Sequence, residues 1–154
     1  MRRALCALLL AGCPAKPDIP CGDVVAVGTG VAAFEALDDE LRMVLGNQGG
    51  YHLPLAARVC TLDEPGLIHI LAEIEGTGEI VTDTSGERLW LDDGDCCAVV
   101  LDLIGFLESP GTDTGYTRFD PADLAGQVVR ITLTITDGGG ETHVDTARVT
   151  VLAP

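Results

Sequence analysis

Residues 128–137 read Val-Val-Arg-Ile-Thr-Leu-Thr-Ile-Thr-Asp, and this stretch decides the fold class. From Val129 to Ile135 an apolar side chain stands at every second position, with arginine or threonine between them. A period of two is typical of a β-strand that buries one face. The following Asp137–Gly140 predicts a turn, and a return strand is expected over residues 143–152, with one face formed by Ala147, Val149 and Val151. The sequence therefore predicts a C-terminal β-hairpin.

Similar short apolar stretches recur upstream of this hairpin. Further strands are expected at residues 24–27, 53–60, 68–74, 88–91 and 98–107. Helical signal is weak: residues 34–45 predict either one helical turn or an edge strand, and residues 120–124 predict a single turn capped by Asp120. About seven short strands separated by turns favour an all-β fold, an immunoglobulin-like antiparallel β-sandwich, with a jelly roll as the alternative.

The first thirteen residues have the composition of a bacterial export signal. Arg2 and Arg3 are positive, residues 4–10 are apolar but too few to span a bilayer, and Leu10-Ala11-Gly12-Cys13 closes the segment. This tetrapeptide resembles the lipobox of bacterial lipoproteins. The resemblance implies cleavage before Cys13 and acylation of its thiol and new amino terminus, which anchors stably because two lipid chains hold a protein where one does not. An ordinary secretory signal, or a buried N-terminal strand, is the alternative.

This interpretation divides the chain into three parts. Residues 1–12 are expected to be a lipoprotein signal peptide, residues 13–22 a lipidated cysteine and proline-rich tether, and residues 23–154 a single immunoglobulin-like domain. Pro14, rather than aspartate, follows Cys13. By resemblance to the sorting rule of enteric bacteria, this favours the outer membrane over the inner. The expected location is extracytoplasmic and lipid-anchored.

The chain is strongly acidic. Its formal net charge is −15, and loss of Arg2 and Arg3 with the signal takes that charge to −17. Such a surface repels nucleic acid and anionic headgroups, so both are excluded as partners. The hydrophobic fraction of 47% is too high for an intrinsically disordered chain. A folded domain that meets the membrane through its lipid anchor is therefore expected.

Four cysteines remain once Cys6 leaves with the signal and Cys13 takes lipid, and these are Cys21, Cys60, Cys96 and Cys97. An even number in an oxidising compartment favours two disulfides. Neighbouring residues on a strand point to opposite faces, so Cys96 and Cys97 reach different partners more easily than each other. We expect Cys21 and Cys60 each to bridge to one of them. A thiol metal site is disfavoured because no Cys-x-x-Cys spacing occurs.

Two segments carry a family resemblance. Residues 46–52, Gly-Asn-Gln-Gly-Gly-Tyr-His, and residues 123–139 around the C-terminal hairpin are similar to a group of uncharacterised bacterial surface lipoproteins. Those proteins carry one immunoglobulin-like domain behind a lipobox. The resemblance implies a fold and a location, and it implies no reaction.

The loop from Gln48 to His52 is the first candidate binding surface. Gly49 and Gly50 allow positive φ and close backbone approach, while Gln48, Tyr51 and His52 offer hydrogen-bonding groups and an aromatic face of the kind used for glycan or peptide binding. The alternative is that the glycines simply make a turn and Tyr51 closes the end of the sandwich, its hydroxyl bonded to backbone.

Trp90 is the second candidate. An exposed tryptophan on a β-sandwich can stack against a sugar ring, whereas a lone tryptophan in a sandwich is more often part of the core. Aromatic residues make up only 4% of the chain, which argues against a glycan-binding face built from several rings.

Acidic loops suggest a weak calcium site. Asp92, Asp93 and Asp95 place three carboxylates close together, and Ca²⁺ takes six to eight oxygen ligands from such groups. The run does not match a calcium-binding loop of the EF-hand type, and short acidic runs arise readily as solvated loops in so acidic a chain. No other metal or cofactor is expected.

Enzymatic motifs are lacking. The chain has no Gly-x-Ser-x-Gly nucleophile elbow, and His52, His69 and His143 match no metal-binding spacing. We therefore expect a protein that is not an enzyme. The favoured function is a structural or accessory lipoprotein that docks on another envelope protein, and the alternative is a ligand-binding module for glycan or calcium.

Overall fold

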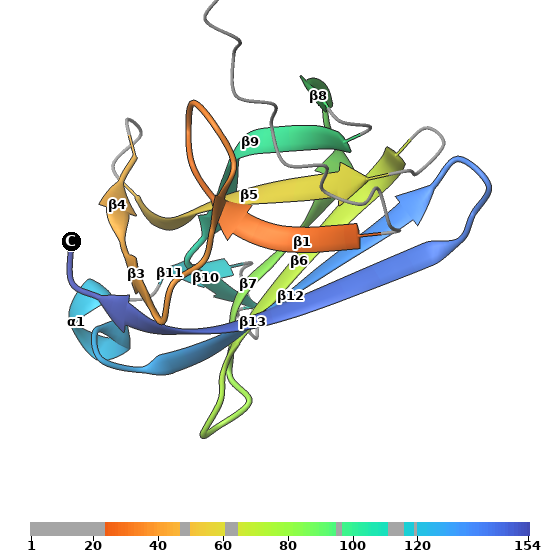
Figure 1. Ribbon diagram of the computed structural model, residues 1–154. Coiled ribbons are helices and arrows are strands. Elements are labelled where there is room, and N and C mark those ends of the chain that lie inside the picture. Colours follow the sequence, from red (N-terminus) through yellow and green to blue (C-terminus); the bar gives the residue numbers. More distant parts are fainter. Residues whose placement is uncertain (1–23, 47–49, 61–64, 95–96, 111–115, 119) are drawn as a thin grey trace, which may run out of the picture.

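The computed structural model describes residues 24–46, 50–60, 65–94, 97–110, 116–118 and 120–154 (Figure 1). These residues form thirteen strands and one short helix. The strands are β1 (Val24–Thr29), β2 (Glu35–Ala36), β3 (Glu40–Arg42), β4 (Val44–Leu45), β5 (Tyr51–Cys60), β6 (Pro65–Ile74), β7 (Ile80–Glu87), β8 (Leu91–Gly94), β9 (Cys97–Phe106), β10 (Glu108–Pro110), β11 (Tyr116–Arg118), β12 (Val128–Asp137) and β13 (Thr142–Leu152), and the helix is α1 (Pro121–Leu124).

Two sheets pack face to face. The first, called here the β5 sheet, has the order β2-β1-β5-β9-β8, with β4 also paired to β5. The second, the β12 sheet, has the order β3-β13-β12-β6-β7, and β10 and β11 form a separate small ribbon. Neighbouring strands run antiparallel except β3, which pairs with β13 in parallel. The predicted antiparallel β-sandwich is confirmed.

The strand order is that of an immunoglobulin domain. In that fold one sheet carries strands A, B, E and D and the other carries G, F and C. Here β1, β5, β9 and β8 take the first four places, and β13, β12 and β6 take the other three. The chain changes sheets early, because β1 pairs with β5 whereas β3 pairs with β13. This connectivity favours the immunoglobulin-like alternative over the jelly roll.

Some expected elements differ from the observed ones. Strand β7 was not expected, because after Val81 and Thr82 its sequence is polar. A strand was expected at residues 88–91, but β8 begins only at Leu91, and residues 88–90 link the two sheets. For residues 34–45 the edge-strand alternative is confirmed and the helical turn is not: the segment forms the short strands β2, β3 and β4, of which β2 and β3 are the outer strands of the two sheets. The total therefore exceeds seven because edge strands too short to show a periodic pattern pair along the longer ones.

The predicted turn at residues 120–124 is confirmed as α1. The Asp120 carboxylate accepts a hydrogen bond from the Ala122 amide at 2.9 Å, which satisfies one of the free N–H groups at the helix start. Pro121 stands in the first turn, and Leu124 is fully buried. The helix therefore fixes the corner from which β12 begins.

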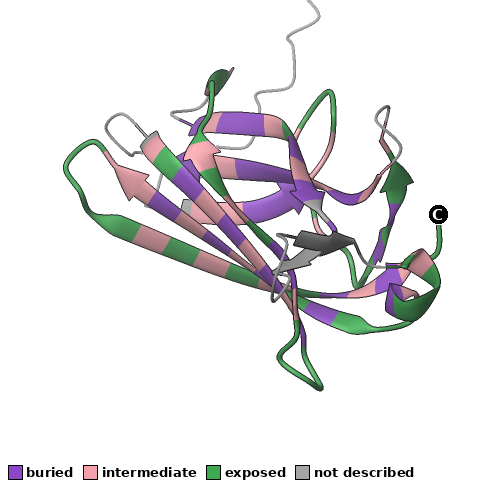
Figure 2. Ribbon diagram, turned by 180° about the vertical axis from the view of Figure 1, so that it is seen from behind, coloured by how far each residue is buried: buried purple, intermediate pink, exposed green. Residues whose placement is uncertain are grey.

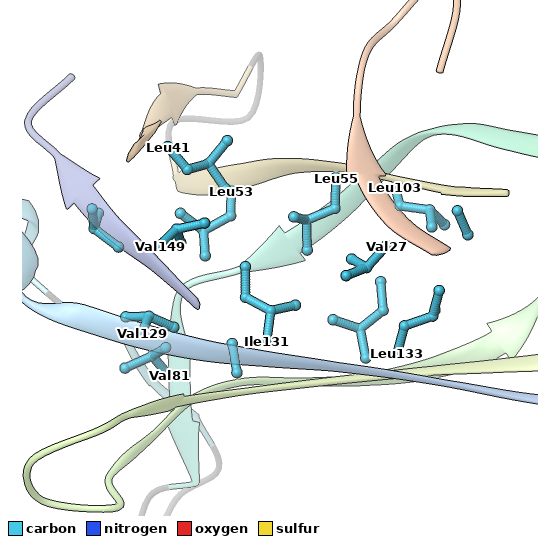
Figure 3. Packing of buried hydrophobic residues seen from close by; sticks show 14 of the residues in the cluster. Val27, Leu41, Leu53, Leu55, Val81, Leu103, Val129, Ile131, Leu133 and Val149 are labelled. Atoms are coloured by element: carbon cyan, nitrogen blue, oxygen red, sulfur yellow. The ribbon is translucent and has the colours of Figure 1, made fainter. Parts of the chain in front are cut away.

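The core lies between the sheets. Buried and more exposed residues alternate along β12, which is visible as colour banding in Figure 2. Figure 3 shows Leu53 and Leu55 of β5 on one side of the core, with Ile131 and Leu133 of β12 opposite. All four are fully buried. The alternation read from residues 129–135 is thus the alternation that forms the core.

Within the described residues, no helix combines the length and apolar character needed to cross a membrane.

Candidate functional site

The first candidate surface lies at the β4–β5 hairpin. The Gly46 amide donates to the Gly50 carbonyl oxygen at 2.7 Å, which closes the hairpin. Tyr51 is half-buried and packs against the core, and His52 is only 8% exposed. A Cβ atom at Gly46 would lie 3.3 Å from His52 Nδ1, so the imidazole sits close against the glycine backbone. Gln48 lies outside the described residues.

This arrangement favours the structural interpretation of the loop. A ring used for stacking must present a face to solvent, whereas Tyr51 is partly buried and packs against the core. His52 is likewise covered rather than presented.

Trp90 also packs against the core. It is half-buried, and its Nε1 atom is buried without a hydrogen-bond partner among the described residues. The neighbouring apolar side chains behave differently: Leu89 is 81% exposed and Leu91 is 46% exposed. Trp90, at the end of the link between β7 and β8, therefore packs against the core, whereas Leu89 before it and Leu91 at the start of β8 are exposed.

The calcium candidates do not converge on one point. Asp92 Oδ1 accepts a hydrogen bond from the Gly94 amide at 2.8 Å. Asp93 Oδ2 lies 3.1 Å from Arg58 Nε, an ion pair that lacks hydrogen-bond geometry. Asp95 lies outside the described residues. Two described carboxylates, one bonded to a backbone amide and the other paired with Arg58, supply far fewer than the six to eight oxygen ligands that a calcium ion takes.

One disulfide joins the cysteines that the structure describes. Cys60 on β5 and Cys97 on β9 are direct cross-strand neighbours, and their sulfur atoms are bonded. The bridge lies within the β5 sheet, unlike the bridge between sheets of antibody domains. It agrees with the expectation that Cys60 bonds to one member of the adjacent pair. Cys13, Cys21 and Cys96 lie outside the described residues, and a Cys21–Cys96 bridge stays a prediction.

A different cluster emerges at the β12–β13 hairpin. In the part of the chain that the structure describes, Asp137, Glu141 and His143 are the one group of three or more metal-ligating side chains whose donor atoms lie within 4.8 Å of one another. The His143 Nε2 atom lies 3.4 Å from Asp137 Oδ2. The sequence interpretation missed this group because it examined the histidines only for spacing motifs. The predicted turn was the available signal, since it folds residue 143 back beside residue 137.

The Asp137 carboxylate is held in its ionised form. Its pKa is lowered chiefly by the hydrogen bond that it accepts from the Glu141 amide at 2.8 Å, and less by the His143 side chain and the Gly139 amide. Partial burial opposes this by raising the pKa. The net result is a negative charge fixed beside the imidazole.

Comparisons of the chain with protein-family models, with curated proteins and with solved structures each found no match. The resemblance to bacterial surface lipoproteins therefore stays a prediction from the sequence.

Proposed function

We propose that this chain is an extracytoplasmic, lipid-anchored immunoglobulin-like module, without catalytic activity, that works by binding another protein of the cell envelope. Cys13 is the proposed attachment point, and the outer membrane is the proposed location. The observation that carries the interaction is the pair of exposed leucines at the edge strand β8, Leu89 just before the strand and Leu91 as its first residue.

Export, on which the proposed anchor depends, is supported by two observations. Residues 1–13 have the order of charge, apolar region and small residues that an export signal requires. The Cys60–Cys97 disulfide is the kind of bond that persists in oxidising compartments and is rare in the cytosol. Export carries the chain into the kind of compartment in which disulfides form.

The interaction is supported by where apolar surface is exposed. Strand β8 pairs with β9, and among the described residues nothing pairs with its other edge. An edge strand offers unpaired backbone groups to an incoming chain. Leu89 and Leu91 add apolar side chains at the same place, and Leu89, at 81%, is the most exposed large hydrophobic side chain among the described residues.

A glycan-binding function has less support. It would use the rings of Tyr51 or Trp90, and both rings pack against the core. Calcium binding at Asp92 and Asp93 has less support as well, because both carboxylates have partners within the chain. Binding to another protein is therefore better supported than binding to a glycan or to calcium.

Site-directed photo-crosslinking in cells tests the proposal. A photoreactive amino acid replaces Leu89 in the full-length chain, and a matched variant carries it at Val144, an exposed apolar position on β13 that is 59% accessible. We expect an adduct of defined mass with an envelope protein from position 89 and none from position 144. Cys13→Ala should release the chain from the membrane fraction and lower the adduct yield. The same adducts from both positions, or none from position 89, would contradict the proposal.

A further inference from the structure

The strongest unassigned feature is the tip of the β12–β13 hairpin, which projects past the neighbouring strands (Figure 1). Asp137 ends β12, Glu141 lies in the turn, and His143 stands on β13 opposite Ile135. Side chains two residues apart on a strand share a face, so Asp137 and His143 lie on the same face as Ile135. The hairpin therefore brings two carboxylates and one imidazole together on one short segment.

We propose that Asp137, Glu141 and His143 form a binding site for a divalent first-row transition-metal ion, with zinc as the probe ion. Their donor atoms all lie within 4.8 Å of one another. Two ligands that each stand about 2.1 Å from a tetrahedral zinc ion are separated by about 3.4 Å. His143 Nε2 and Asp137 Oδ2 already have that separation, 3.4 Å. Glu141 is exposed, and its carboxylate donor lies within 4.8 Å of the other two donor atoms.

The choice of metal follows from the donors. Imidazole nitrogen suits zinc, copper, nickel and iron, whereas calcium requires six to eight oxygen ligands. Two carboxylates and one histidine supply too few oxygens for calcium. Three protein ligands also leave coordination positions open to water or to a group from another molecule.

The backbone holds the first ligand in place before any ion binds. Asp137 Oδ1 accepts from the Glu141 amide at 2.8 Å, and the Asp137 amide donates to the Glu141 carbonyl oxygen at 2.9 Å. Asp137 is 14% exposed at its side chain and His143 is 21% exposed, so neither rotates freely. A hydrogen bond to the non-ligating oxygen is the support that metal-binding carboxylates ordinarily have.

The charge around the tip favours a cation. Residues 137–147 contain three acidic side chains and neither lysine nor arginine. The formal net charge of the chain is −15, which raises the local concentration of cations. The competing account is that Asp137 and His143 form only an ion pair that closes the hairpin. The inference goes beyond the proposed function and does not depend on finding a protein partner.

Calorimetric titration with zinc tests the site. The protein is the oxidised full chain carrying Cys13→Ala, free of any polyhistidine tag and stripped of metal with a chelator. We expect one zinc ion per chain, with no competition from calcium. His143→Ala should weaken zinc binding at least about tenfold, since loss of supporting groups alone costs 10- to 100-fold in other metal sites. Glu141→Gln should weaken it as well, while leaving intact the backbone amide that holds Asp137.

The matched control is His69→Ala. His69 Nε2 lies 2.8 Å from Asp83 Oδ1 on the β12 sheet, so it forms a histidine–carboxylate pair outside the three-donor group. Zinc affinity should be unchanged in this variant. Binding that survives His143→Ala, an equal loss in His69→Ala, or no zinc binding at all would overturn the site. Thermal melts in chelator check that each variant is folded.

Discussion

The two sheets of this sandwich are built differently. The β12–β13 ladder runs through nine residue pairs without a register shift, and buried residues alternate with solvated ones along β12. In the β5 sheet the β5–β9 ladder shifts register between Leu55 and Ala57, in the middle of the strand. Strand β5 buries Ala56 and Cys60 as well as Leu55 and Val59, so it lacks a clean alternation. A strand with one solvated face can be recognised in the sequence by its period of two, whereas a strand buried on both faces lacks that alternation.

The sheets also use different cross-strand links. The outward face of the β12 sheet carries two ion pairs with exposed arginines, Glu73 with Arg130 and Glu75 with Arg148. The β5 sheet carries the Cys60–Cys97 disulfide and the less exposed Arg58–Asp93 pair. Register shifts also occur in the β12 sheet, between β12 and β6 and between β6 and β7, so the regular ladder is that of β12 with β13. The comparison predicts that regular pairing stabilises the β12–β13 pair and that local constraints stabilise the β5–β9 pair.

The largest effect should come from the shared core. Leu55→Ala in the β5 sheet and Leu133→Ala in the β12 sheet each remove a fully buried side chain, and each should cost about 2–5 kcal/mol of unfolding free energy. Urea denaturation measures both, with Val144→Ala as an exposed control expected to change stability by less than about 0.5 kcal/mol. If only Leu133→Ala were costly, the two sheets would not share one core.

Removal of the disulfide should affect the β5 sheet next. The double variant Cys60→Ala/Cys97→Ala should lose about 2–4 kcal/mol, because the bridge no longer restricts the unfolded chain. The cross-strand pair Thr132 and Thr146 in the other sheet is the comparison, and its double alanine variant should lose less than about 1 kcal/mol. Equal losses in guanidinium unfolding would remove the distinction between the sheets.

Asp102, in β9 at the register shift, should tolerate replacement by glycine. Asp102 has a φ of 54°, a left-handed conformation that glycine adopts without strain. Asp102→Gly should therefore be neutral or stabilise by up to about 1 kcal/mol, whereas Thr146→Gly in the regular β13 strand should destabilise by about 1 kcal/mol. Melting temperatures of the two variants check this. A clear loss in Asp102→Gly would mean that the aspartate side chain supports the bulge.

Breaking an ion pair should change the unfolding free energy by a smaller amount, and the amount should differ between the two sheets. Glu73→Gln, which breaks an exposed pair with Arg130, should cost about 0.2–1 kcal/mol and less in 1 M salt. Asp93→Asn should cost about 1 kcal/mol with weaker salt dependence, because the Nε atom of Arg58 is buried and loses its counter-charge. Chemical denaturation at two salt concentrations separates the two cases, and the reverse order of costs would contradict the comparison.

The smallest effect concerns pH at the hairpin tip. The pKa of Asp137 is lowered from 3.8, so its ionised form stabilises the fold above that pH, and this contribution is lost as pH falls through the lowered pKa. NMR titration in chelator should show a midpoint below 3.8. In His143→Ala most of the lowering should persist, because the Glu141 amide is its first cause. A midpoint that returned to 3.8 would assign the effect to the imidazole instead.

Much of this fold could be predicted from sequence where the physical signal is local. The hairpin of residues 129–152 follows from alternation, and the Asp120 cap follows from its hydrogen-bonding chemistry. Strand β7 was missed because it is polar beyond Thr82. Its place as an edge strand is decided by pairing with β6, which is a tertiary interaction.

The candidate functional sites were harder to predict because they too depend on tertiary interactions. Burial decides whether Tyr51 and Trp90 present a ring to solvent, and burial depends on what packs over a residue from elsewhere in the chain. The Asp137, Glu141 and His143 group required the hairpin register, which places residues six apart side by side.

The most direct test of the account is intact-mass analysis of the protein recovered from membranes, followed by non-reducing peptide mapping. The account predicts a chain that begins at Cys13 with lipid attached and a peptide pair linked through Cys60 and Cys97. A chain that retains Met1 and carries free thiols at Cys60 and Cys97 would contradict both the lipid anchor and the oxidising location.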